Sequence, residues 1–105
     1  MIKNAEVNNL FNLVDYQDGT IVSKTLIDKK AGTITIFAFD QNQGLSEHTA
    51  PYDALLIVLD GEVKITISGK PFKLKKDEII VMPANKPHAV NALSKMKMLL
   101  VMIHS

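Results

Sequence analysis

Apolar and polar residues alternate in short runs along most of this chain. Val63, Ile65 and Ile67 alternate with polar residues, which is the pattern of a strand with one solvated face. The run 55–59 is apolar throughout, as expected for a strand covered on both faces. Turn residues separate such runs roughly every eight to twelve residues, which predicts an all-β sandwich or barrel. The predicted strands are 20–27, 31–40, 45–49, 53–60, 62–68, 71–75, 78–82, 87–93 and 96–103.

One segment has helical spacing instead. Val7, Leu10, Phe11 and Val14 repeat at intervals of three and four, which predicts at most one short helix, before residue 18. No linker or low-complexity segment interrupts the pattern. The chain is therefore predicted to be a single domain, 1–105, with an N-terminal extension over 1–18.

Composition supports the β prediction and excludes several classes of function. Of the 105 residues, 25 are Ile, Val or Thr, whose branched side chains favour strands over helices. All 12 cationic side chains are Lys, and against 11 acids they give a net charge of +1. Without Arg the chain lacks the guanidinium fork for phosphates and guanine edges, so nucleic-acid binding is not expected. The absence of Cys excludes disulfides, thiolate metal sites and Cys nucleophiles.

Targeting signals are also missing from the pattern. No apolar run approaches the roughly 18 residues of a membrane span, and the first residues contain no apolar segment of a secretory signal. The sequence therefore predicts a cytoplasmic protein with no membrane partner.

Two segments each contain a histidine at a comparable place. Gly-Leu-Ser-Glu-His-Thr-Ala-Pro-Tyr-Asp-Ala-Leu-Leu-Ile-Val-Leu-Asp-Gly at 44–61 resembles the first motif of the cupin family, and Asp-Glu-Ile-Ile-Val-Met-Pro-Ala-Asn-Lys-Pro-His at 77–88 resembles the second. The resemblance covers about 21–103 and is closest to small single-domain cupins. It implies a double-stranded β-helix, or jelly-roll barrel, that forms a homodimer. It also implies a divalent metal, such as Zn, Ni, Fe, Mn or Cu, held by three His and one Glu.

The metal motif is degenerate in this chain. His48 and His88 occupy two of the four ligand positions that the resemblance implies, whereas Ala50 and Ala54 stand at the other two. With two ligands missing, the histidines are interpreted either as a weak metal site or as pocket side chains that hydrogen-bond water or substrate.

Other polar residues near the motifs receive specific predictions. Strand parity turns Asp53 away from the face that carries the histidines, so it substitutes for the missing Glu only if the stretch 49–52 bulges and reverses the parity. Tyr52 has the right parity to place its hydroxyl at the pocket mouth. Asp77 and Asn85 replace two glycines of the second motif. His104 is penultimate and is expected to be a frayed surface group.

The two imidazoles are predicted to converge at one interior cavity. The expected pocket is lined by His48, His88, Tyr52, Leu56, Val58, Met82, Val90 and Met102.

Two classes of function fit these residues. The first is a barrel protein that binds a small molecule, and possibly a divalent metal at His48 and His88. The alternative is a small cupin enzyme, either a metal-dependent oxygenase, an isomerase or a cyclase-like catalyst, in which His48 and His88 bind a metal or act as general base and the catalytic residue stays unassigned. A homodimer is expected because apolar faces need cover, with Phe37, Phe39, Leu99 and Val101 predicted to face outward and residues 1–27 contributing.

Overall fold

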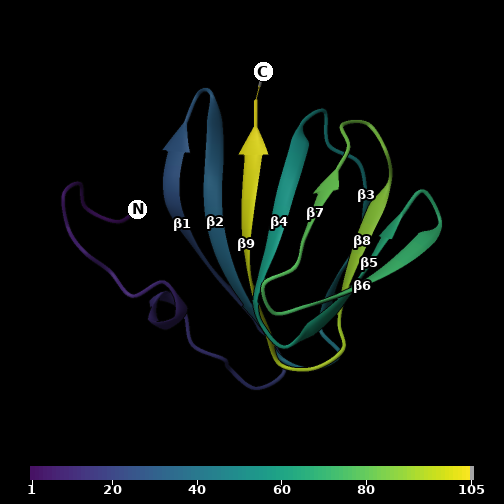
Figure 1. Cartoon of the computed structure of the whole chain (residues 1–105), viewed down its shortest axis with the longest axis horizontal. Coiled ribbons are helices and arrows are strands. Elements are labelled where there is room, and N and C mark those ends of the chain that lie inside the picture. The colour runs from purple at the N-terminus through teal and green to yellow at the C-terminus, as the bar shows by residue number, and fades with distance from the viewer. Residues whose placement is uncertain (105) are drawn as a thin grey trace.

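A computed structural model describes residues 1–104 and contains two antiparallel sheets (Figure 1). The first sheet has the order β1-β2-β9-β4-β7 and the second has the order β3-β8-β5-β6. The strands are β1 Ile21–Lys29, β2 Gly32–Phe39, β3 Gly44–His48, β4 Asp53–Asp60, β5 Glu62–Ile67, β6 Lys70–Lys75, β7 Ile79–Met82, β8 His88–Ala92 and β9 Met96–Ile103. This arrangement confirms the predicted all-β, jelly-roll architecture.

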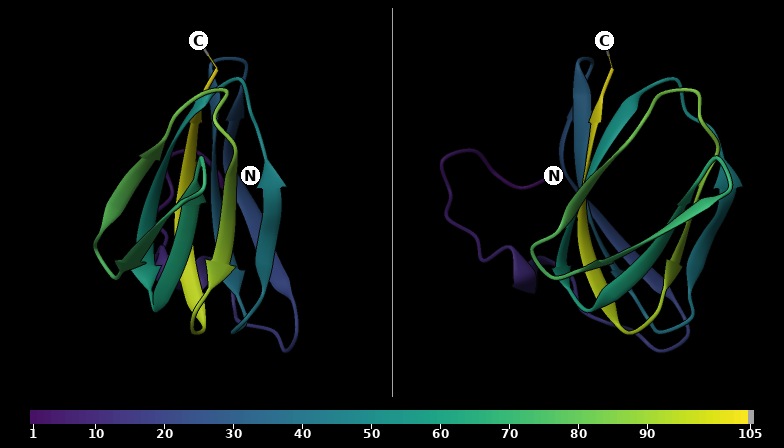
Figure 2. Two further views of the ribbon diagram at one scale, coloured as in Figure 1. Left: turned by 90° about the vertical axis from the view of Figure 1, so that its right-hand side faces the viewer. Right: turned by 45° about the vertical axis from the view of Figure 1, so that its right-hand side comes forward.

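The two sheets curve to face each other and enclose the main core (Figure 2). Where the strands are regular, alternate residues point inward, as the period of two requires. Leu56 and Val58 on β4 meet Val63 and Ile65 on β5 in one buried cluster. In Figure 1 the strands converge at one end and fan out toward the end where the C-terminus lies. This wider end is called the barrel mouth below.

The predicted N-terminal helix is reduced to a single 3₁₀ turn, η1 Phe11–Leu13. Val7, which was to begin the helix, is 100% exposed. A helix of two turns gains too little to offset its nucleation cost unless it packs along its whole length. Only the end of the segment packs: Val14 is buried on the outer face of the first sheet. No helix in residues 1–104 is long and apolar enough to cross a membrane.

A second core lies on the outer face of the first sheet. Val14 and Leu26 pack there against Ile36 and Ala38 of β2. This placement corrects the sequence reading of β2: Phe37 and Phe39 were expected to face outward, yet both belong to the interior cluster. Parity alone left the choice of face open in this strand because both of its faces are apolar.

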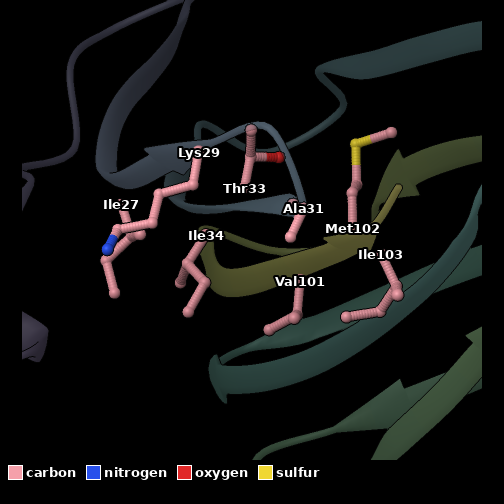
Figure 3. A pocket seen from close by; sticks show the side chains of 9 residues that line it. Ile27, Lys29, Ala31, Thr33, Ile34, Val101, Met102 and Ile103 are labelled. Carbon is pink, nitrogen blue, oxygen red and sulfur yellow. The ribbon is translucent and has the colours of Figure 1, made fainter. Parts of the chain in front are cut away.

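Part of that outer face is not covered by the N-terminal segment. One residue from each strand of the first sheet forms a continuous cross-strand row, in which each member is the register partner of the next: Ile27, Ile34, Val101, Leu55 and Val81. A cavity of about 210 Å³ lies at the β1 end of this row. Figure 3 shows Ile34, Val101 and Ile103 on one side of the sheet there, with Thr33 and Met102 on the other. The name apolar row is used below for the five cross-strand partners Ile27, Ile34, Val101, Leu55 and Val81.

Candidate ligand-binding site

The two motif histidines lie directly opposite each other on neighbouring strands. His48 ends β3 and pairs in register with His88, which begins β8. Their ring centroids are 4.4 Å apart, and the ring planes meet at 66° in an edge-to-face arrangement. The structure therefore brings together the two residues that the motifs singled out.

A β-bulge places His48 beside its partner. Leu45 pairs with Val90 and His48 pairs with His88, so β3 advances by three residues while β8 advances by two. Leu45 packs against the interior cluster, and in a regular strand the side chain at 48 would point the opposite way. The extra residue reverses that parity and turns the imidazole toward His88.

Each imidazole is held by a backbone carbonyl two residues earlier. The Nδ1 atom of His48 lies 2.7 Å from the carbonyl oxygen of Ser46, and that of His88 lies 3.2 Å from the oxygen of Lys86. A carbonyl only accepts hydrogen bonds, so each Nδ1 is the protonated, donating nitrogen. In the neutral rings, both Nε2 atoms then keep a free lone pair.

The pair stands at the barrel mouth, above the interior cluster. His88 is 7% exposed, whereas His48 is largely exposed. Of the other predicted pocket residues, Met82 and Val90 are buried, Met102 is half-buried, and Leu56 and Val58 are fully buried. The cavity in Figure 3 is lined by neither histidine. The imidazoles form the polar end of an apolar interior, and the enclosed pocket itself stays a prediction.

The structure does not supply the four-ligand metal set that the family resemblance implies. Ala54 is buried on the inner face of β4, where a Glu side chain would have pointed into the barrel. No group of three His, Asp or Glu side chains within residues 1–104 is close enough to hold a metal ion. The donor set present is two imidazoles, which does not fit a resident cofactor of the usual cupin type.

Asp53 has a structural role in place of ligation. Its side chain is exposed, as parity predicted, and one carboxylate oxygen accepts a 2.8 Å hydrogen bond from the backbone N–H of Ala84. The N–H of Asn85 donates to the carbonyl of Ala50 at 2.8 Å. These two bonds tie the turn that precedes His88 to the segment that follows His48.

Sequence reasoning missed a second aromatic pair at the same end of the barrel. The rings of Tyr52 and His104 stack, with centroids 4.0 Å apart and planes 30° apart. The backbone N–H of His104 donates to the carbonyl of Ala31 at 2.8 Å, so His104 is not the frayed terminal group that was expected. The sequence did contain a signal for this position: His104 has the same parity as Met102, which points inward from β9.

Comparisons with known proteins agree on one family. Residues 35–104 match the family model described as a cupin domain. A conserved protein of unknown function from Streptococcus pyogenes is 34% identical, with a TM-score of 0.93 over 99% of this chain and 91% of that chain. A cupin 2 conserved barrel domain protein from Leptotrichia buccalis is 49% identical, with a TM-score of 0.88. The match covers 91% of this chain but 47% of that longer one. A search of the curated proteins finds no match.

Proposed function

The chain belongs to the cupin family, and from that premise we propose that it binds a small molecule at the barrel mouth through His48 and His88. The observation that supports this function is the facing pair of imidazoles, which are register partners with rings 4.4 Å apart. Their Nδ1 atoms are both engaged by backbone carbonyls. The two Nε2 atoms are thereby left to contact a ligand.

The chemistry of the pair suits a ligand with a polar end. A neutral imidazole accepts a hydrogen bond at Nε2, and the same atom donates once the ring is protonated. His88 shares the inner face of β8 with Val90, which belongs with Met82 to the interior cluster, so the apolar surface of the barrel interior adjoins the pair. A small molecule would place its polar group between the histidines and its apolar part toward this surface.

A divalent cation is the competing occupant. Zinc sites in proteins usually have at least three protein ligands, and this mouth supplies two imidazoles. A cation there would take its other ligands from water or from a bound small molecule. We therefore expect binding much weaker than at a four-ligand site.

The imidazole signals of an NMR spectrum test the proposal directly. The chain has three histidines, so only three ring signals need assignment. We would titrate the protein with a panel of small carboxylates, amides and sugars, and separately with Zn²⁺. We expect at least one organic probe to shift the signals of His48 and His88. His48→Ala or His88→Ala should weaken that binding about five- to tenfold, the value of one hydrogen bond.

The control for these variants is Glu47→Ala, an exposed neighbour on β3, which should bind as wild type does. Submicromolar Zn²⁺ binding that both histidine variants abolish would replace our proposal with a metal site. If no probe moves either signal and each His→Ala variant lowers the melting temperature by many degrees, the pair is structural.

We also propose that the chain forms a homodimer through the apolar row. Val81 and Ile79 on the edge strand β7 are 55% and 60% exposed. The row carries no charged side chain across five strands. A second copy of the same face can therefore cover it without burying an unpaired charge. The cavity beside Ile27 and Ile34 lies on the same face as the exposed β7 side chains. In the proposed dimer, the β7 side chains of one copy would fill the cavity of the other.

A further inference from the structure

We propose that Tyr52 and His104 form a second wall of the ligand site, and that the site takes a small planar carboxylate. This inference rests on the proposed function, because it describes the same mouth. It adds two contact residues and a ligand class.

The positions of the pair follow from the register of β4 and β9. Asp53 pairs with Ile103, so Tyr52 and His104 stand opposite each other one residue beyond these strands. They share the parity of Ala54 and Met102, which pack in or against the interior cluster. The ring–ring contact of 4.0 Å confirms that they meet.

This pair lies at the same end of the barrel as the motif histidines. β4 begins and β9 ends at the mouth in Figure 1, where β3 also ends and β8 begins. A short segment joins residues 48 and 52. Within it, the carbonyl of Ala50 accepts a hydrogen bond from the backbone N–H of Asn85. All three histidines of the chain thus lie at the same end of the two facing sheets.

His104 is held in place on two sides, so its ring can form a fixed surface for a ligand. Its backbone is held by the hydrogen bond to Ala31, and one face of its ring lies against Tyr52. Both residues are half-buried, so part of each side chain remains accessible. A preorganised aromatic surface favours a flat ligand, because little side-chain entropy is lost on binding.

The charges of the mouth favour a carboxylate. No Asp or Glu in residues 1–104 joins the histidines in a three-member cluster, and the nearby Asp53 is bonded to the N–H of Ala84. An anionic group there accepts a hydrogen bond from the Tyr52 hydroxyl, and from an Nε2 atom of the motif pair once that ring binds a proton.

Three matched probes separate the parts of this proposal: benzoate, benzamide and cyclohexanecarboxylate. Benzamide keeps the ring and removes the charge, whereas cyclohexanecarboxylate keeps the charge and removes the planarity. We expect benzoate to shift all three imidazole signals and to bind at least about threefold more tightly than either analogue. Equal binding of benzamide would overturn the carboxylate assignment, and equal binding of cyclohexanecarboxylate would overturn the planar one.

Variants then test the second wall independently. Tyr52→Ala and His104→Ala should each weaken benzoate binding about threefold or more, and the signals of His48 and His88 should still move at saturation. The control is Tyr16→Ala, because the chain's other tyrosine packs on the outer face of the first sheet. It should bind benzoate normally.

The outcomes distinguish the two proposals. If His48→Ala and His88→Ala weaken binding while Tyr52→Ala and His104→Ala have no effect, the second wall is wrong and the proposed function stands. If only Tyr52 and His104 matter, the role given to the motif pair is wrong. If benzoate shifts no imidazole signal, the carboxylate site is wrong, whatever other probe binds.

Discussion

Lys97 and Phe11 join the N-terminal segment to the outer face of the first sheet. The ammonium of Lys97 donates a 2.6 Å hydrogen bond to the carbonyl of Phe11, and it lies 3.5 Å from the centroid of the Phe11 ring. Lys97 is 2% exposed, although lysine is rarely buried to this degree. This contact fixes the segment that covers the second core.

The Lys97 contact predicts a stability loss that is confined to one region. Lys97→Ala should lower the free energy of unfolding by about 2 kcal/mol, because it removes a charge-assisted hydrogen bond, a cation–π contact and the packing of the side-chain stem. Lys97→Met should lose less, since it retains the apolar stem. Denaturant unfolding measures both changes, and limited proteolysis should cut residues 1–20 faster in both variants.

Lys95→Ala is the control for this prediction. Its ammonium is exposed and lies 5.9 Å from the centroid of the Tyr16 ring, so its loss should matter little. Unchanged proteolysis of Lys97→Ala would show that Val14 and its neighbours hold the segment without the lysine.

Asp40 predicts a pH-dependent contribution to stability. The backbone N–H groups of Gly19 and Gln41 donate to its carboxylate at 2.7 and 2.9 Å. These bonds hold the pKa of Asp40 below its ordinary value. Because the folded-state pKa is lowered, the stabilisation is present above about pH 4 and is lost as the pH falls through the folded-state pKa.

Melting curves of wild type and Asp40→Asn between pH 7 and pH 2 check this prediction. The wild type should melt at a higher temperature at pH 7, and the difference should shrink toward the acid end. A constant difference across the range would mean that the variant perturbs packing and that the charge has no part.

The alternation of apolar residues was sufficient to predict the nine strands, because a period of two fixes which residues share a face. It could not fix which face is inner in β2, where Ile36 and Phe37 are both apolar. That choice depends on the N-terminal segment, which covers one side of the first sheet.

The candidate site was predictable in identity but only partly in geometry. Motif positions singled out His48 and His88, and the structure brings them together. The bulge after Leu45 was not predictable at that place, since it arises from pairing between β3 and β8. His104 was missed because its partners, Tyr52 and Ala31, are remote in sequence.

The turn before His88 gives a prediction about the motif's missing glycine. Asn85 has a φ of +65°, a left-handed conformation that glycine adopts freely and that Asn tolerates better than most residues. Asn85→Gly should change stability by less than about 1 kcal/mol, whereas Asn85→Val should cost about 1–2 kcal/mol. Denaturant unfolding of both variants measures the difference. Equal stability of the two would show that the turn relaxes out of this conformation.

The apolar row predicts the assembly state. Sedimentation of the wild type at tens of micromolar should show a dimer, because the row and Ile79 present apolar surface that a monomer leaves in water. Val81→Lys places a charge on the exposed side of β7 and should yield a monomer. Its unfolding transition as a monomer should remain cooperative, because Val81 lies outside both cores.

Thr66→Lys is the matched control for the dimer prediction. Thr66 lies on β5 in the other sheet, and it alternates with the buried Val63 and Ile65 so that its side chain points outward. The same added charge there should leave the dimer intact. A wild-type monomer would overturn the prediction, as would dissociation by Thr66→Lys with Val81→Lys still dimeric. The second result would move the interface to the sheet that carries His88.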